Sequence, residues 1–431
     1  MTKDQVGFKE SLRLNTVLQF VSMALLSCSG LIFWVGIARY YPAASVGQAA
    51  ALLSVGLAIV FVCNLGLDAV VALHRGDNVL ISTVLFQCGL LSMGLSSLVA
   101  ICTSIALKLP VTQSLRNPLE QFIFVAIIAG ASLSTFSEMR ILALGNWRIW
   151  LLKIVLSVGL RLTFLLLLIS NPIYQPPVIM FAALAGESIS ALVVWFLLVH
   201  KTPLCSVVSP ISRATRNLAL ASWVGQLAVG APTVMVPVIV SSIVSNSRNS
   251  NFFLCWSIAT ALGWSTKALG RNLLVQRTST IEEQTKFHST TQFLAVVLCV
   301  TATFLALPIG WIFSVILGDS YRDLRFLIPI LVASNIPWAF FTIDLVQSTT
   351  TGRLGRLMTT SVVPSLLSLI GCTFGVLVAS VLGASIGFLI GSLLAVIILQ
   401  NQFLRRNLRR QINEHRSKTK LKLLRKSCTS G

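Results

Sequence analysis

Several charged side chains lie inside long apolar stretches, where a charge at the centre of a bilayer costs about 2.5–3.5 kcal/mol on insertion scales. Arg161 is the clearest case. Lys153, Ser157 and Arg161 are four residues apart, as are Lys267 and Arg271, so each set falls near one face of a helix. Because like charges at this spacing repel, both sets require an anionic partner or water.

A cationic cavity is the leading interpretation of these charges, since excess positive charge between low-dielectric walls selects an anion. A diphosphate suits such a cavity, because arginine offers a fork to paired oxygens. The predicted substrate-binding residues are Arg140, Lys153, Arg161, Lys267 and Arg271. Two alternatives stay open: structural ion pairs with Glu138, Glu187 or Asp344, and charges that reach the membrane interface along their aliphatic stems.

The few acids within the apolar stretches are candidates for ion or proton coupling, namely Asp68, Glu187 and Asp344. The sequence holds no GxxxxGK[ST], HExxH or GxSxG motif, and its nine cysteines form neither a CxxC nor a cluster with zinc spacing. We therefore expect no enzyme activity, no metal site and no cofactor.

The composition indicates that the helices carrying these charges lie in a membrane. The 431 residues are 55% hydrophobic and 11% charged, whereas soluble domains carry about 25% charged residues. A helix needs about 20 apolar residues to cross a bilayer. The sequence predicts an all-α polytopic membrane protein without a soluble domain, whose twelve spans are 16–38, 46–67, 79–107, 120–141, 147–170, 178–200, 218–244, 252–275, 291–316, 326–348, 357–381 and 385–404.

The lysines and arginines predict the orientation of these spans. With the N-terminus inside, cytoplasmic segments and helix ends hold 26 basic residues, ten of them in the tail, and outer segments hold six. We expect a multi-pass protein of the cytoplasmic membrane with both termini in the cytoplasm. The basic tail fits an anionic lipid surface better than nucleic acid, which we do not expect as a partner.

The longest loop divides the spans into six and six. The predicted parts are an N-terminal six-helix bundle (1–200), a basic cytoplasmic linker (201–217), a C-terminal six-helix bundle (218–404) and a basic tail (405–431). Each bundle opens on a similar polar stretch, which suggests a parallel internal repeat. Pro232 and Pro237 interrupt the seventh span, either to let it bend between two transport states or because proline is common in membrane helices.

Three stretches of the chain resemble a known family. The first is Asn15–Gly66, which contains Ile37-Ala38-Arg39-Tyr40-Tyr41-Pro42 and Val46-Gly47-Gln48. The second is Arg140–Arg148. The third is Ile316–Tyr321, which is followed further along the chain by Gly352-Arg353 and Gly383–Gly387. In these the chain is similar to the lipid-linked O-antigen and exopolysaccharide flippases of the polysaccharide transport family. That family belongs to the multidrug/oligosaccharidyl-lipid/polysaccharide exporter superfamily.

The resemblance implies two six-helix bundles around a central cavity that opens to each side in turn. It also implies export of an undecaprenyl-diphosphate-linked oligosaccharide for cell-surface polysaccharide biosynthesis, with membrane lipid, a polysaccharide polymerase and glycosyltransferases as expected partners. An ion-coupled multidrug antiporter of the same fold is the alternative. It would need an acidic cavity, whereas basic residues outnumber acids in these spans.

Overall fold

The structure is a computed structural model of the 431-residue chain. It describes residues 3–63, 78–106, 115, 117–144, 146–199, 213–275, 281–350 and 354–428. Within these ranges, side chains are left undescribed at several helix ends, chiefly 3–20, 78–88, 213–222, 264–275, 281–288 and 401–428.

The described chain is helical, apart from short turns, and contains no strand. The first half comprises α1 (Lys3–Tyr40), α2 (Ala43–Cys63), α4 (Asn78–Ala106), α5 (Pro118–Leu144), α6 (Trp147–Ser170) and α7 (Pro176–Val199). The second half comprises α8 (Arg213–Ile243), α9 (Asn246–Val275), α10 (Ile281–Leu317), the short 3-10 helix η2 (Asp319–Tyr321), α11 (Leu324–Ala333), α12 (Asn335–Thr350) and α13 (Leu354–Cys428).

Over the residues that the structure describes, each predicted span falls on helix. The span predicted at 326–348 is made of α11 and α12, which meet at Ser334. The last two spans lie on α13, whose backbone leaves helical geometry at Ala379 and Ser380 and so turns between 357–381 and 385–404. The protein is therefore a polytopic α-helical membrane protein with about twelve transmembrane helices in two six-helix bundles.

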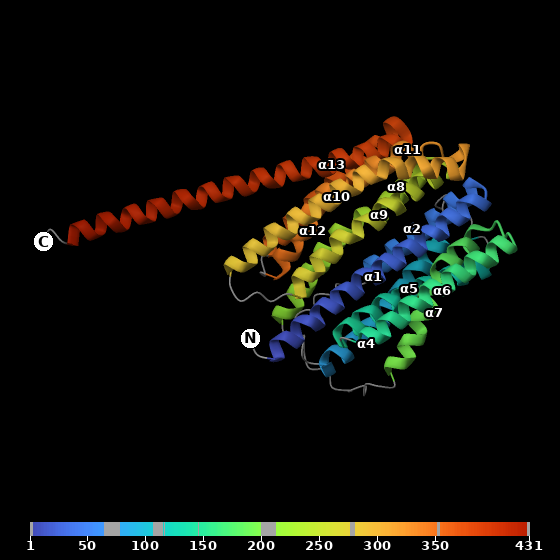
Figure 1. The fold of residues 1–431 in the computed structure, drawn as a ribbon, viewed down its shortest axis with the longest axis horizontal. Coiled ribbons are helices and arrows are strands. Elements are labelled where there is room, and N and C mark those ends of the chain that lie inside the picture. Colours follow the sequence, from blue (N-terminus) through green and yellow to red (C-terminus); the bar gives the residue numbers. More distant parts are fainter. Residues whose placement is uncertain are drawn as a thin grey trace.

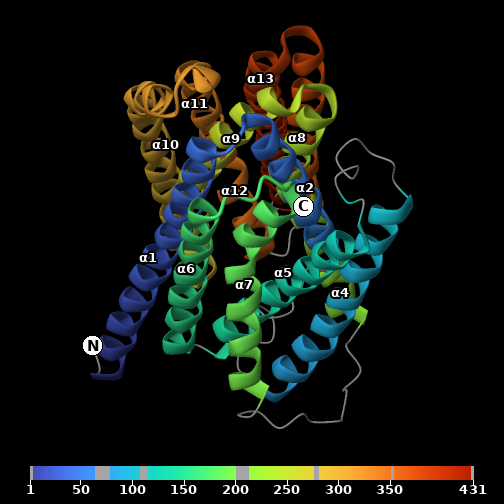
Figure 2. The same ribbon diagram turned by 90° about the vertical axis from the view of Figure 1, so that its right-hand side faces the viewer.

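The two bundles correspond to the two halves of the chain (Figures 1 and 2). In the first bundle α4 packs on α5, α5 and α6 pack on α7, and α1 packs on α6. In the second, α8 packs on α13, α10 on α11 and α9 on α12. The bundles meet through α1 and α2 on one side and α8 and α9 on the other.

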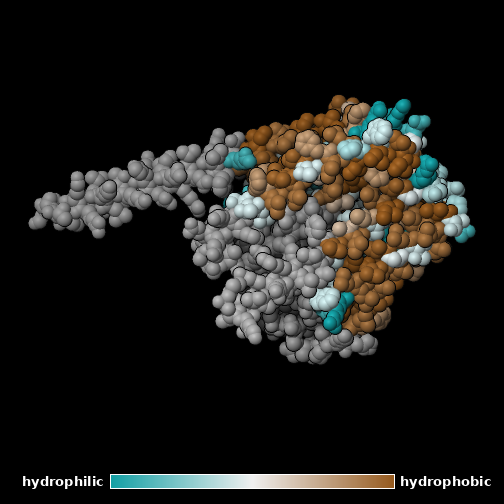
Figure 3. Space-filling view, in the orientation of Figure 1, coloured by the Kyte–Doolittle hydropathy of each residue, from teal (hydrophilic) through white to brown (hydrophobic). Residues whose placement is uncertain are grey.

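The outer surface of the bundles is apolar. Phe196, Phe293 and Phe374 are 64%, 72% and 67% exposed. Figure 3 shows a broad hydrophobic flank, with hydrophilic residues gathered at the end of the bundles near α11 and the turn of α13. Eight of the described helices are long and apolar enough to cross a membrane. Such a surface is stable in lipid rather than in water.

The turn of α13 brings two glycine-bearing segments together. Gly371 faces the backbone carbonyl of Gly387, and Gly375 faces that of Gly383, so closely that an added Cβ would overlap the opposing backbone. Small residues four apart permit this approach of membrane helices, where van der Waals packing replaces the hydrophobic effect. Ser380, with a φ of 54°, makes the turn itself.

Gly387→Val should therefore separate the two segments of α13 and lower the free energy of unfolding by about 1–3 kcal/mol, the usual cost of overpacking. The measurement is thermal unfolding of the purified protein in detergent. Gly94→Val on α4 is the matched control, because no atom lies within 4 Å of a Cβ at that position. Equal destabilisation by both substitutions would contradict this account.

The predicted domain boundaries remain predictions. The linker 201–217 lies largely outside the described residues, and only its last part, from Arg213, falls on α8. In the basic tail 405–431 the backbone continues α13 as far as Cys428, well beyond the bundles (Figure 1).

Candidate functional site

Lys153 on α6 forms an ion pair with Glu138 on α5. Its Nζ lies 2.5 Å from Oε1 of Glu138 and 2.9 Å from Oγ of Ser134. The side chain of Lys153 is 3% exposed and that of Glu138 is 28% exposed. The ammonium group of Lys153 is therefore buried, whereas the carboxylate of Glu138 is partly exposed.

Arg161 holds three helices together. Its NH2 donates to Oε1 of Glu187 on α7 at 2.6 Å, and its Nε donates to the carbonyl of Ala183 at 3.0 Å. Its NH1 donates to Oγ of Ser29 on α1 at 3.1 Å. The side chain of Arg161 is 8% exposed and that of Glu187 is 31% exposed. Each nitrogen of this guanidinium thus has a protein acceptor.

Gly186 makes this pairing possible. A Cβ there would overlap the carbonyl of Ser157, so α7 approaches the backbone of α6 at this level only because residue 186 is glycine. Arg161 lies one helical turn after Ser157 on α6, so this approach places Glu187, the residue after Gly186, beside Arg161.

Asp344 on α12 pairs with Arg356, which lies at the start of α13. The guanidinium meets the carboxylate as a fork: NH2 contacts Oδ1, and Nε donates to Oδ2 at 3.2 Å. Arg356 is one of the 26 basic residues that the charge distribution assigns to the cytoplasmic side, and the sequence does not single it out as the partner of Asp344. A signal existed, because opposite charges twelve residues apart flank the turn between α12 and α13.

The remaining predicted residues are placed less completely. Arg140 on α5 is 3% exposed; its NH2 donates to the carbonyl of Leu198 at 3.3 Å, and its guanidinium lies 5.9 Å from the ring centroid of Trp195. Lys267 and Arg271 lie on α9, but their side chains are outside the described residues, as is Asp68 altogether.

The five predicted cavity residues are therefore not seen as one cluster. Lys153 and Arg161 have the carboxylate partners that the ion-pair alternative named, Glu138 and Glu187. In this conformation either cation can meet an anionic substrate only after its ion pair opens.

The prolines of α8 leave two backbone carbonyls without their helical donors, and neighbouring helices supply replacements. Pro232 frees the carbonyl of Ala228, which accepts from Oγ of Ser365 on α13. Pro237 frees the carbonyl of Thr233, which accepts from Nε1 of Trp256 on α9 at 3.0 Å. Membrane helices tolerate proline where such partners exist. The sequence predicted that the two prolines interrupt this helix, but it did not predict Ser365 and Trp256 as the donors to the freed carbonyls.

A seam closes the two bundles against each other at one end. Gly47 near the start of α2 lies against the backbone carbonyl of Asn246 at the start of α9, and a Cβ at Gly47 would overlap that oxygen. Nδ2 of Asn249 donates to the carbonyl of Gly47 at 2.7 Å. Nearby, Arg39 NH1 donates to the carbonyl of Ile316 at 2.9 Å, so α1 also reaches α10.

The contact between the bundles continues along α2. The ring of Phe61 lies directly on Gly230, where a Cβ on α8 would overlap it. Trp34 and Phe253 meet edge to face with centroids 4.8 Å apart and join α1 to α9. The seam therefore consists of close backbone contacts, side-chain hydrogen bonds to backbone carbonyls and ring contacts, with no ion pair between the bundles among the described side chains.

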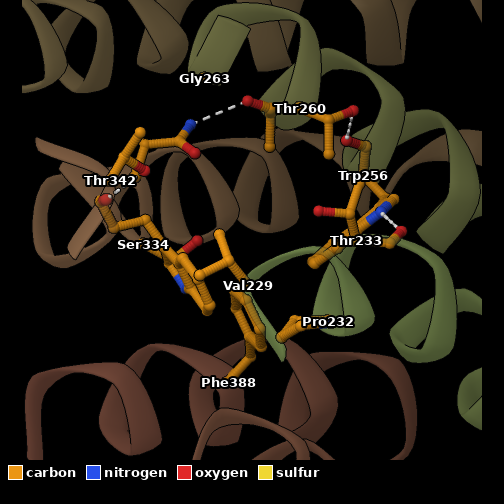
Figure 4. Close-up of a pocket in the computed structure, with 12 residues that line it drawn as sticks. Val229, Pro232, Thr233, Trp256, Thr260, Gly263, Ser334, Thr342 and Phe388 are labelled. Carbon is orange, nitrogen blue, oxygen red and sulfur yellow. Dashed lines mark hydrogen bonds between the residues drawn. The ribbon is translucent and has the colours of Figure 1, made fainter. Parts of the chain in front are cut away.

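A pocket of about 60 Å³ lies within the second bundle, beside the kink of α8 (Figure 4). Its walls come from α8, α9, α12 and α13, and they include Val229, Pro232, Trp256, Trp338 and Phe388. No charged side chain lines it among the residues whose side chains the structure describes. Sequence reasoning did not find this site, because its aromatic and hydroxyl residues are scattered between Val229 and Phe388 of an apolar chain.

Comparison with solved structures identifies the fold. An inward-facing multidrug resistance MATE family transporter of the MOP superfamily matches 92% of this chain and 99% of its own at 16% identity, with a TM-score of 0.62. The MATE multidrug transporter DinF-BH matches 92% and 95% at 11% identity, with a TM-score of 0.65. An outward-facing MATE family transporter matches 90% and 94% at 17% identity, with a TM-score of 0.56.

These neighbours are transporters rather than enzymes, and the chain shares their fold. No protein-family model matches the sequence. No curated protein matches it either.

Proposed function

We propose that this protein is a membrane transporter whose two bundles expose a substrate path to each side of the membrane in turn. The observation that carries this proposal is the seam of Gly47, Asn246 and Asn249, which closes the bundles at one end through contacts that can separate without leaving a buried charge unpaired. The fold shared with membrane transporters supports it.

The seam falls at the face that the distribution of basic residues assigns to the outside. Arg39 and Arg248 are among the few basic residues of the predicted outer segments, and both lie beside the seam. The protein would then sit in the cytoplasmic membrane, closed on the outer side, with both termini in the cytoplasm.

For the cargo we propose a polyprenyl-diphosphate-linked oligosaccharide, flipped for the biosynthesis of a surface polysaccharide. The acids within the described membrane spans, Glu138, Glu187 and Asp344, each accept from a basic side chain. None of them is left to receive a cationic drug. The surplus of basic residues in the chain favours an anionic headgroup instead.

Glu187 and Asp344 are then the candidates for ion coupling, with Asp68 as a third from the sequence. Protonation of Glu187 or Asp344 would free its arginine, Arg161 or Arg356, for the diphosphate. The other predicted cationic residues, Arg140, Lys153, Lys267 and Arg271, are proposed to line the same path. Membrane lipid, a polysaccharide polymerase and glycosyltransferases are the proposed partners.

An ion-coupled multidrug antiporter is the second candidate, because the neighbours' descriptions name multidrug transporters. The two functions differ in the charge of the cargo, which an experiment can separate.

The test is reconstitution of the full chain in proteoliposomes with a fluorescent polyprenyl-diphosphate sugar. We expect protein-dependent flipping of this lipid, with little flipping of the same sugar on a neutral lipid, because only the diphosphate offers paired oxygens to arginine. Uptake of a cationic dye driven by an ion gradient, without flipping of the diphosphate lipid, would replace the flippase by the antiporter.

A further inference from the structure

The pocket in the second bundle has aromatic walls whose positions are fixed by one another. The rings of Trp338 and Phe388 are stacked at 6.3 Å and 5°, and Trp256 meets Phe388 edge to face at 5.1 Å. Thr233, Thr260 and Thr342 add hydroxyl groups to the lining, in which no described residue is charged (Figure 4). Walls of this kind accept a neutral group that has both an apolar and a polar part.

Trp338 carries a buried donor that no described residue accepts from. Its Nε1 is buried and has no acceptor among the described residues, whereas Nε1 of Trp256 donates to the carbonyl of Thr233. Buried donors of indole rings normally find a partner, so an unused one lining a pocket indicates an acceptor brought by a ligand.

Asn335 supplies the complementary acceptor. Its Nδ2 donates to the carbonyl of Ala259 at 2.8 Å, which fixes the amide plane. Its Oδ1 faces Gly263, where an added Cβ would lie 2.8 Å from it. The residues that line the pocket therefore carry one donor without an acceptor and one amide oxygen in a fixed plane. A secondary amide carries the complementary set, one acceptor and one donor.

The size and position of the pocket limit the kind of ligand that it can bind. A volume of about 60 Å³ is less than half of the roughly 150 Å³ of an apolar protein cavity that holds benzene, so the pocket takes a substituent rather than a whole ring. Val229 and Pro232 line it on either side of Gly230, against which Phe61 of the first bundle packs. The pocket thus borders the seam, where a transported molecule passes between the bundles.

We propose that this pocket binds the acetamido group of an N-acetylated sugar. The amide carbonyl accepts from Nε1 of Trp338, the amide N–H donates to Oδ1 of Asn335, and the methyl group packs on Phe388. That the amide belongs to a transported sugar rests on the proposed function; the fit to a secondary amide rests on the pocket alone.

The experiment measures the indole N–H resonances of the full chain, labelled with ¹⁵N-tryptophan, in nanodiscs. The probes are the methyl glycoside of N-acetylglucosamine and, as its match without the amide, methyl glucoside. We expect the Trp338 resonance, identified by its absence in Trp338→Phe, to move downfield and saturate with the first probe only. Trp338→Phe keeps the stacked ring and loses the donor, so binding should weaken about tenfold.

Gly263→Ala is the second variant, because its Cβ would displace Oδ1 of Asn335 and should weaken binding while leaving the Trp338 ring in place. A Trp338 resonance that neither probe shifts, or that both shift equally, would overturn the proposal. Binding needs no translocation. Specific binding without flipping of the diphosphate lipid therefore refutes the proposed cargo alone, and flipping without binding refutes the pocket alone.

Discussion

Gly47→Val should open the seam between the two bundles. The added side chain has no place in the closed seam, because even its Cβ would overlap the backbone carbonyl of Asn246, and a backbone atom cannot rotate away as a side chain can. Overpacking costs about 1–3 kcal/mol, and that cost falls only on the closed conformation. The population should therefore shift roughly tenfold or more towards a conformation in which α2 and α9 separate at this end.

The shift can be measured as an electron spin distance between labels at Ala44→Cys and Ser247→Cys, two exposed positions on either side of the seam, in a background without the native cysteines. Gly159→Val on α6 is the control, since no atom lies within 4 Å of a Cβ there. If the distance distribution is the same in Gly47→Val and in Gly159→Val, the added side chain is accommodated by small shifts at the seam, and the bundles do not move apart as units.

The fold could be predicted closely from the sequence, because the bilayer leaves so few solutions. Apolar stretches long enough to cross the bilayer must be helices, and the basic residues indicate which helix ends face the cytoplasm. What the sequence could not show were breaks inside a continuous apolar stretch. The join of α11 and α12 at Ser334 lies inside one predicted span, and hydropathy gave no sign of it. The turn at Ser380 lies close to the end of one predicted span, before the start of the next at 385, but the close packing of Gly383 and Gly387 that accompanies this turn is not something hydropathy measures.

The candidate site was predictable only in part. The charged residues were evident, since each is costly in hydrocarbon, and their partners were among the alternatives considered. The choice between a shared anion and fixed pairs depends on how closely helices approach, and Gly186 decides this for Arg161. The pocket of Trp338 escaped prediction because uncharged residues on four helices give no local signal.

Arg161→Met should destabilise the protein more than any other single change to these ion pairs. The substitution removes donors to Ala183, Ser29 and Glu187 at once, and it leaves the carboxylate of Glu187 without its cation. Breaking a buried pair from one side costs about 3–5 kcal/mol. We expect a loss at the lower end of this range, because the side chain of Glu187 is 31% exposed and its carboxylate can be solvated. Thermal unfolding in detergent measures the loss.

The double variant Arg161→Met/Glu187→Leu separates a structural role from a transport role. If the pair serves only to join α1, α6 and α7, removing both charges should recover part of the lost stability, because no buried charge then remains. Flipping of the diphosphate lipid should stay low in the double variant even so, since the proposed mechanism needs Arg161 once its pair opens. Recovery of both stability and flipping would show that the pair is a structural link, and the path of the diphosphate would then have to rely on other cations, such as the buried Arg140.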